Sequence, residues 1–282
     1  MKVLETLPPI LRITKYTLAD EVRHRSFVIM FFICAGFVFL IRGCYKGSYI
    51  VNGQQLDAAA IAWYISKASF HVIAVGVMLI AALLSMRIFR RDRDEGMQSC
   101  ILAKPIARWQ YVTGKILGLW MLSVLFMFAL HFIIFLIAFM NTKAVVPEYL
   151  TASLLCSINL LFVVLAALLL SLLLPEVIVF LCILGVGITS FVADGIYTLS
   201  QSQMVQAAMQ HSGAQPPSGL TWWKVVYYLW PKLSGVQQWT TSLISSETFH
   251  GFGPVHPLVN VLLYCLILGS LLFLRFRRED VV

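Results

Sequence analysis

Charged residues are scarce in this chain: 12% of its 282 residues are Asp, Glu, Lys or Arg, whereas 60% are hydrophobic. Soluble domains carry about a quarter charged residues and about half apolar ones, so a soluble core could not absorb the apolar excess. The apolar runs are continuous, unlike the alternating strands of about ten residues that build membrane β-barrels. The composition therefore predicts an all-α integral membrane protein, because lipid demands that every backbone polar group be satisfied internally.

The chain also lacks the motifs of intramembrane enzymes and of bound nucleotides or metals. Neither H-E-x-x-H nor G-x-S-x-G occurs, and the six cysteines contain no C-x-x-C, so they are interpreted as small hydrophobic residues. Gly114-Lys115 is not a phosphate-binding loop, because that motif requires Gly at 109 and Ser or Thr at 116, where Trp109 and Ile116 stand. We therefore expect no catalytic residue, no metal and no cofactor bound by this chain.

Charged residues delimit six apolar runs, and each run suits one membrane-spanning helix of about 20 residues. The first run has only 15 residues, but Arg25 and Arg42 at its two ends can snorkel to the lipid headgroups. Pro254 and Pro257 predict that the last helix begins near Leu258. The runs are 27–41, 68–86, 116–142, 149–175, 177–193 and 248–274.

Basic residues predict the orientation of these helices. Six spans place both termini on one side, and with cytoplasmic termini fifteen of the 21 Lys and Arg residues are inside and six are outside. The net charge of +8 then reflects topology and the anionic inner leaflet, and requires no nucleic acid. We predict a single transmembrane domain over 1–282, with both termini in the cytoplasm.

Three segments outside the spans have distinct characters. Residues 1–26 are predicted to form a cytoplasmic interfacial helix, because in 10–25 an apolar stripe shares one face and the basic residues lie mostly off it. The stripe comprises Ile10, Ile13, Thr17, Leu18 and Val22. Residues 87–115 form the cytoplasmic loop. Residues 200–256 form an extracytoplasmic segment whose Trp and Tyr content predicts a cap at the membrane interface.

Several small or polar residues have local signatures within or between the apolar runs. Asn52-Gly53 predicts a two-residue hairpin in the first outer loop, and Gly114-x-x-x-Gly118 is a pattern of close helix packing. Polar side chains within apolar runs suggest function by default, but hydrogen bonds to neighbouring helices are the favoured interpretation here. These polar residues are His71, His131, Asn159 and, near the outer end of its run, Asp194.

The stretch 90–115, RRDRDEGMQSCILAKPIARWQYVTGK, is the most informative segment. A loop that only sets topology needs bases alone, yet this one interleaves Asp92, Asp94 and Glu95 with three arginines. EGMQSCILA predicts two helical turns, and Pro105 suits the start of a second helix that runs into the third span. A short helix held below the membrane between two spans can act as a lever.

On these residues the chain resembles the type-2 ATP-binding-cassette (ABC) exporter permeases. The resemblance covers nearly the whole chain, and it departs from the family pattern at Gly96-Met97-Gln98, where members often have Gly-Thr-Leu. It implies that the short helix is a coupling helix that docks in a groove on an ATPase subunit. By this resemblance Glu95 and Gly96 begin the helix, Ile101 and Leu102 face the ATPase, Pro105 and Arg108 close the turn, and Tyr111, Gly114 and Lys115 set the start of the third span.

The resemblance also implies partners and a location. Two ATPase subunits would bind ATP and Mg from the cytoplasm, and two permease chains, identical or paralogous, would form a path through a bacterial cytoplasmic (inner) membrane. An apolar path would suit lipids, lipid-linked glycans or amphipathic drugs, but the family also handles peptides and ions, so the sequence does not identify the substrate. An alternative is a membrane scaffold of the same architecture, which would transmit ATP-driven motion to an extracytoplasmic partner bound at 200–256.

Overall fold

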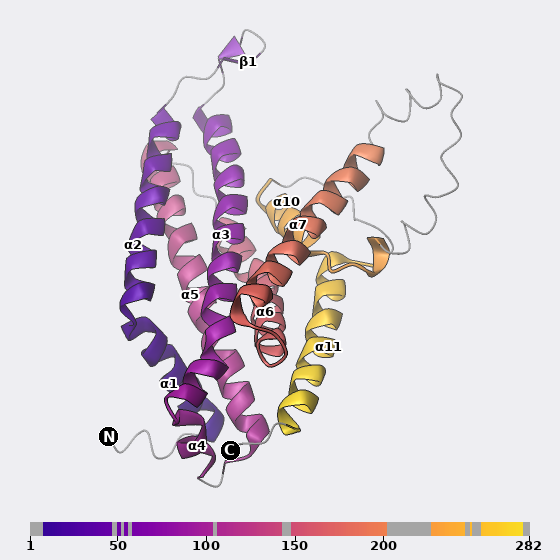
Figure 1. Ribbon diagram of the computed structural model, residues 1–282. Coiled ribbons are helices and arrows are strands. Elements are labelled where there is room, and N and C mark those ends of the chain that lie inside the picture. Colours follow the sequence, from indigo (N-terminus) through magenta and orange to yellow (C-terminus); the bar gives the residue numbers. More distant parts are fainter. Residues whose placement is uncertain are drawn as a thin grey trace, which may run out of the picture.

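The computed structural model describes residues 8–46, 50–51, 54–55, 58–103, 106–142, 148–201, 227–245, 249 and 255–278. It is a bundle of long helices with a few shorter ones at its two ends, which confirms the predicted all-α architecture (Figure 1). The long helices are α2 (Arg25–Leu40), α3 (Ala58–Asp94), α5 (Arg108–Thr142), α6 (Glu148–Ser171), α7 (Glu176–Gln201) and α11 (Pro257–Arg277). The shorter ones are α1 (Pro9–Arg23), α4 (Met97–Leu102) and α10 (Leu233–Ser245).

Five of the described helices, α3, α5, α6, α7 and α11, are long and apolar enough to cross a membrane alone. The sixth predicted span corresponds to α2, whose 16 residues rise about 24 Å, less than the roughly 30 Å of a hydrocarbon core. It reaches the length and composition of a span only together with α1, from which its axis turns by 69°. A 3₁₀ helix, Ile41–Lys46, continues α2 outward.

Helix α3 extends beyond the apolar run that predicted it. The run 68–86 lies within α3, which has 37 residues and continues to Asp94 through a stretch rich in arginine, a good helix former. By contrast, α11 begins at Pro257, one residue from the predicted start, and the side chain of His256 accepts a hydrogen bond from the backbone N–H of Leu258.

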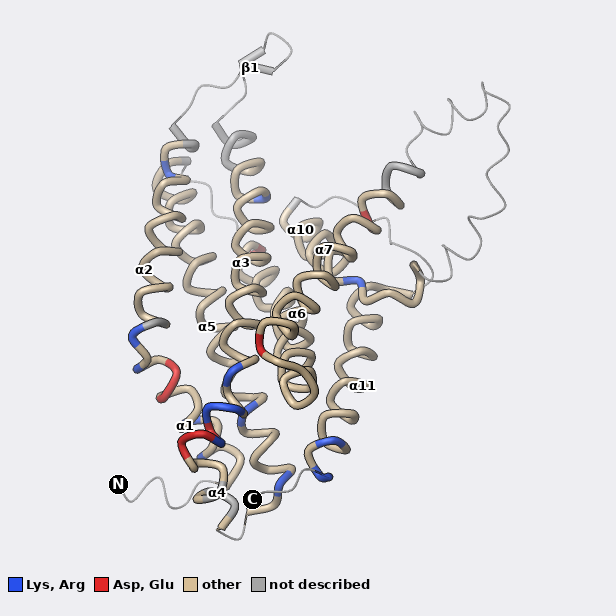
Figure 2. Tube along the Cα trace, in the orientation of Figure 1, with Lys and Arg blue, Asp and Glu red and all other residues tan. Residues whose placement is uncertain are grey.

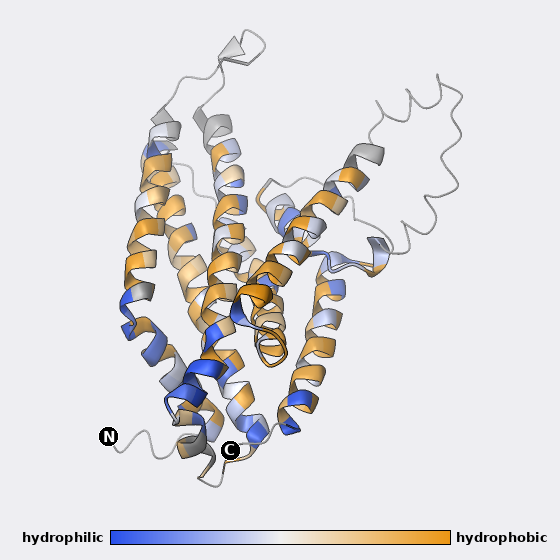
Figure 3. Cartoon of the chain, viewed as in Figure 1, coloured by the Kyte–Doolittle hydropathy of each residue, from blue (hydrophilic) through white to orange (hydrophobic). Residues whose placement is uncertain are grey.

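Charge and hydropathy divide the bundle into a polar end and an apolar middle. Lys, Arg, Asp and Glu gather at the end that holds α1, α4 and the last turn of α11 (Figure 2). Apolar residues dominate the helices above this end (Figure 3). The first and last described helices thus reach the same end, as an even number of crossings requires.

Helix α6 is the central element of the bundle. It packs against α3, α5, α10 and α11, and 67% of its most apolar 18-residue window is buried, compared with 22% for α7 and 28% for α11. Its buried face includes Leu160, Val164 and Leu168, each 0% exposed. The outward faces of α7 and α11 are apolar, as expected of helices that contact lipid.

The part of the bundle away from the polar end carries two local features that the sequence predicted in part. Strands β1 (Ile50–Val51) and β2 (Gln54–Gln55) pair antiparallel with Val51 opposite Gln54, which confirms the hairpin, although Asn52 and Gly53 lie outside the described residues. Within the segment 200–256, α10 folds back against α3, α6, α7 and α11. The described part of this segment is therefore built into the bundle instead of only lying over it.

Candidate functional site

Helix α3 ends in a sharp turn at the polar end of the bundle. The backbone N–H of Glu95 donates to the carbonyl of Arg91 at 2.9 Å, and Gly96 has a φ of 67°, a left-handed conformation that side chains with a Cβ disfavour. The N–H of Cys100 then donates to the carbonyl of Gly96 at 3.2 Å and starts α4. The predicted short helix is present as α4, and Gly96 is the residue that permits the chain to reverse.

Asp92 joins the end of α3 to the start of α5. Its carboxylate oxygen Oδ2 lies 2.6 Å from Lys115 Nζ and accepts a hydrogen bond from the hydroxyl of Tyr111. Asp92 is 1% exposed, Lys115 5% and Tyr111 0%. Removing one member of a buried ion pair costs about 3–5 kcal/mol because the other charge remains buried, so this contact holds the two helices in one register.

Arg91, the preceding residue, joins α3 to α1 instead. Its Nη2 atom lies 2.5 Å from Asp20 Oδ2 and 2.7 Å from Glu21 Oε1. Burial raises the pKa of Glu21 above its ordinary value, and the attraction of Arg91 opposes this shift without cancelling it. Asp20 and Glu21 were not predicted as site residues. The signal was two adjacent acids at the end of an otherwise basic amphipathic helix.

Two glycines bring α1 directly against α5. A Cβ atom on Gly114 would lie 2.7 Å from Ile13 Cβ, and one on Gly118 would lie 2.7 Å from Thr17 Cβ. The hydroxyl of Thr14 donates to the carbonyls of Ile10 and Gly114, at 2.9 and 3.3 Å. The small-xxx-small pattern therefore packs two helices of the same chain together.

The predicted apolar stripe of α1 is only partly the face that packs. Ile13 and Thr17 are buried, as expected, but Val22 is 40% exposed, and Thr14 and Glu21 are buried in its place. Ile13 and Thr17 contact the two glycines of α5. Thr14 bonds to the carbonyl of Gly114, and Glu21 is buried beside Arg91 of α3.

Arg108 and Tyr111 connect α5 to the last turn of α11. The Nη1 atom of Arg108 donates to the carbonyl of Arg277 at 3.1 Å. The ring of Tyr111 lies 5.8 Å from that of Phe276, and Phe89 of α3 lies 5.4 Å from the same ring. Three helices therefore meet in one aromatic cluster just above the polar end.

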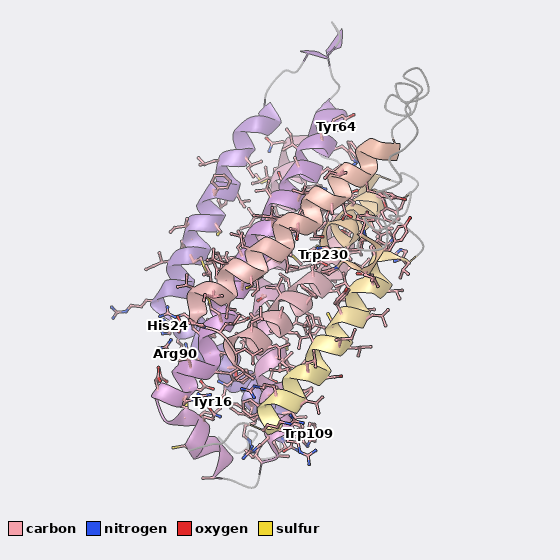
Figure 4. The ribbon with its side chains drawn as sticks, turned by 45° about the vertical axis from the view of Figure 1, so that its right-hand side comes forward. Tyr16, His24, Tyr64, Arg90, Trp109 and Trp230 are labelled. Carbon is pink, nitrogen blue, oxygen red and sulfur yellow. The ribbon has the colours of Figure 1, made fainter. Side chains whose placement is uncertain are left out.

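Arg87 and Arg90 on α3 reach the start of α7. Arg87 Nε lies 3.3 Å from Glu176 Oε2, and Arg90 Nη1 lies 3.7 Å from Glu176 Oε1. Figure 4 shows Arg90 and His24 close together at the polar end, with Tyr64 at the opposite end of the bundle. These contacts connect the start of α7 to the charged last turns of α3.

The predicted site residues lie on three consecutive elements. Glu95 and Gly96 form the turn after α3. Ile101 and Leu102 belong to α4, although their side chains are outside the described part of the structure, as is Pro105. Arg108, Tyr111, Gly114 and Lys115 occupy the first two turns of α5, where Tyr111 and Lys115 meet at Asp92.

A family model described as "ABC-2 family transporter protein" matches residues 11–281. The chain belongs to the ABC-2 transporter family. It is therefore a permease subunit of an ABC transporter and a multi-pass membrane protein. Permeases of this family work with an ABC ATPase. A comparison with curated proteins finds no match.

Within this ABC-2 permease, polar side chains of three spans hold the start of α10. Asn159 of α6 donates to the carbonyl of Leu233 at 2.8 Å, Ser190 of α7 donates to the carbonyl of Pro231 at 3.0 Å, and Asn260 of α11 accepts from the N–H of Lys232 at 3.0 Å. Non-helical backbone inside a membrane protein requires such partners. Asn159 was predicted to have a structural role of this kind, whereas Ser190 and Asn260 were not singled out.

The two histidines within spans also make interhelical hydrogen bonds. His131 Nδ1 on α5 lies 2.8 Å from the hydroxyl of Ser153 on α6, and its ring stacks on Phe70 with centroids 4.5 Å apart. His71 Nδ1 lies 3.3 Å from Gln237 Oε1 on α10. These contacts supply the hydrogen-bond partners that burial in the bundle demands.

Asp194 is the centre of another buried polar cluster, toward the C-terminal end of α7. The hydroxyl of Tyr227 donates to Asp194 Oδ1 at 2.7 Å, and Lys232 Nζ lies 3.5 Å from the same oxygen. Tyr197 stacks on Tyr227 with ring centroids 4.8 Å apart. The carboxylate thus ties α7 to the residues that lead into α10.

Proposed function

We propose that the segment from Glu95 to Arg108 receives the motion of an ABC ATPase and that α1, α3 and α5 carry it together into the membrane. The observation that supports this proposal is that Arg91 and Asp92 each form an ion pair with a different helix. These adjacent residues on the last turn of α3 form ion pairs with α1 and α5, respectively. A displacement of α4 therefore acts on three helices that are joined at their polar ends.

Packing reinforces the electrostatic ties between these helices. The contacts of Gly114 and Gly118 leave no space between α1 and α5, so one helix cannot slide without the other. The Tyr111–Phe276 and Arg108–Arg277 contacts extend the joined group to α11. Close-packed groups switch between discrete arrangements more readily than they deform, which suits a lever that selects between two conformations.

The remaining parts of the proposal follow from the family. Two permease chains, identical or paralogous, form a path between them, and two ATPase subunits bind ATP and Mg on the cytoplasmic side. The pair exports its substrate across a bacterial cytoplasmic membrane by switching between inward- and outward-facing states that differ little in energy. In this arrangement Ile101 and Leu102 of α4 face the ATPase, and Glu95 and Arg108 flank the contact.

The first experiment tests docking. We expect Glu95→Gln and Arg108→Gln to reduce co-purification of the ATPase with the chain while the helical content is unchanged. Asp94→Asn is the matched control, since it removes one exposed charge from the adjacent position and is expected to co-purify normally. Normal co-purification and normal transport by both test variants would show that the interface lies elsewhere.

The second experiment tests transmission separately from docking. The double variant Asp92→Asn/Lys115→Met removes a buried pair without leaving one charge unpaired, so the fold should be retained. We expect it to bind the ATPase but to lose the change in ATPase rate that the permease causes. The control Arg90→Gln/Asp94→Asn removes an exposed pair, 4.0 Å apart, from the same helix. It should remain coupled, because Arg87 keeps the shorter of the two contacts with Glu176 of α7. Equal behaviour of the two double variants would refute the relay.

A second candidate function is a scaffold that moves an extracytoplasmic partner. It is favoured by the hydrogen bonds of Asn159, Ser190 and Asn260, which connect three spans to the outer segment and would transmit their motion to it. Deletion of 202–226 distinguishes the two functions. A scaffold loses a co-purifying outer partner on deletion, whereas an exporter is identified by a substrate that stimulates ATPase activity.

A further inference from the structure

A cavity of about 480 Å³ opens between the start of α5 and the end of α11. Two of its lining residues are arginines, Arg108 and Arg277, and its described lining contains no acidic residue. The other lining residues are apolar and include Trp109, Val112, Phe273 and Leu274. Figure 4 places Trp109 beside the polar end of α11. The cavity therefore combines positive charge on one side with an apolar wall on the other.

Its position in the bundle matches the lipid headgroup level of the inner leaflet. Arg277 is the last residue of α11 and Arg108 the first of α5, so both arginines lie where a span ends. Trp109 is 54% exposed and Leu274 is 58% exposed, whereas Val112 is fully buried and lines the bottom of the cavity. Tryptophan is enriched at this depth because its ring is both apolar and able to donate a hydrogen bond.

We propose that this cavity binds an anionic phospholipid, with the phosphate beside Arg277 and Arg108 and an acyl chain along Phe273 and Leu274. A guanidinium matches phosphate geometry and forms charge-assisted hydrogen bonds with it. Basic pockets between spans on the cytoplasmic side are suited to anionic headgroups, and the inner leaflet is the source of such lipids. A free phosphate ion would use the arginines but would leave the apolar wall uncovered.

Charge distinguishes this cavity from another one at the same end that is lined by described residues. The second cavity, of about 490 Å³, lies beside α1, α2 and α3 and also contains arginines. Four acids line it as well, and Glu21 and Glu176 already pair with its arginines. Among the described residues, the charged lining of the cavity between α5 and α11 is positive, which favours an anionic ligand.

The chain itself, without an ATPase, is sufficient for the test. We expect native mass spectrometry of the purified, delipidated chain to show tighter binding of phosphatidylglycerol than of phosphatidylcholine with the same acyl chains. Arg277→Gln should weaken phosphatidylglycerol binding about tenfold, the loss expected for one charge-assisted hydrogen bond. Arg277→Lys should weaken it less, because it keeps the charge but not the planar fork.

The neighbouring arginines provide matched controls. Arg275→Gln and Arg278→Gln remove the same charge from the same end of α11, but neither residue lines the cavity. Both variants should bind within about twofold of the parent. The Arg277 side chain is exposed and its carbonyl, which Arg108 contacts, is kept in every variant, so Arg277→Gln should fold normally.

Four results would overturn the proposal. Equal binding of the two lipids would make the cavity a nonspecific apolar groove. Equal loss in the Arg275, Arg277 and Arg278 variants would leave only a diffuse basic surface. Displacement of phosphatidylglycerol by equimolar inorganic phosphate would indicate an anion site without a lipid. Binding that appears only after replacing Glu279 and Asp280 by Gln and Asn would mean that the chain's own carboxylates occupy the arginines.

Discussion

Gly114 lies so close to Ile13 that a methyl group on the glycine would come within 2.7 Å of the Ile13 Cβ atom. The contact joins α5 to α1, two helices whose contacting residues are about 100 positions apart in the chain. It also shows why a glycine stands in a helix, where it otherwise costs stability relative to alanine.

Gly114→Ala and Gly118→Ala should both destabilise the protein. Overpacking costs about 1–3 kcal/mol, which exceeds the gain of up to about 1 kcal/mol in helix propensity. Thermal unfolding in detergent measures the change. Gly76→Ala on α3 is the control, because no atom lies within 4 Å of a Cβ built there, and it should be neutral or slightly stabilising. Equal effects at all three positions would show that α1 does not pack against these glycines.

Glu21→Gln should make the stability of the folded protein less dependent on pH. Because burial raises the pKa of Glu21 above its ordinary value of 4.5, the folded state holds this proton more tightly than the unfolded state does. Stability from this group is therefore present at low pH and is lost as the pH rises from 4.5 through the raised pKa.

The measurement is the unfolding temperature across this pH range. As the pH rises through this range, the unfolding temperature of the parent should fall, and that of the Glu21→Gln variant should fall less. Asp20→Asn, which removes the other carboxylate beside Arg91, should change stability by only about 0–1 kcal/mol, since Asp20 is more exposed. A lower unfolding temperature for Glu21→Gln than for the parent at pH 7 would mean that the attraction to Arg91 outweighs the cost of burial.

Asn159→Leu should loosen the start of α10. The substitution removes the hydrogen bond to the Leu233 carbonyl and leaves that carbonyl buried, at a cost of about 1–2 kcal/mol. Hydrogen exchange of residues 233–245 should become faster. Asn141→Leu is a suitable control, because the hydrogen bond of Asn141 among the described residues lies within its own helix, to the carbonyl of Ile137. Unchanged exchange in the Asn159 variant would show that Ser190 and Asn260 suffice to hold α10.

Cys100 on α4 provides a test of orientation and docking. Its side chain is exposed, whereas Cys156 is 1% exposed. In a variant with Cys100 as the single cysteine, a membrane-impermeant maleimide should label inverted vesicles and leave right-side-out vesicles unlabelled. Bound ATPase should slow this labelling at least severalfold. A variant with Cys156 alone should stay unlabelled in both, and labelling of Cys100 from the outside would reverse the proposed topology.

Much of the architecture follows from hydropathy and charge along the chain. The six apolar runs correspond to six helices, the predicted short helix at EGMQSCILA is α4, and the hairpin around Asn52-Gly53 pairs as expected. These features depend on residues close together in sequence, which is why they could be predicted. The length of α3 was underestimated, because charged residues mark the end of the apolar run but do not end the helix, which continues outside the lipid.

The sequence by itself determined that this chain is a helical membrane protein whose charged residues are concentrated around 90–115, because composition and periodicity are local properties, and the motifs of that segment supplied the resemblance to ABC-2 permeases. Only the tertiary structure decided that Asp92 pairs with Lys115, that Arg91 pairs with Glu21, and that Asn159 and Asn260 hold α10. The reason is rotational: an apolar helix can present any of its faces to a neighbour, and the partner of a buried polar side chain depends on how every helix around it is turned.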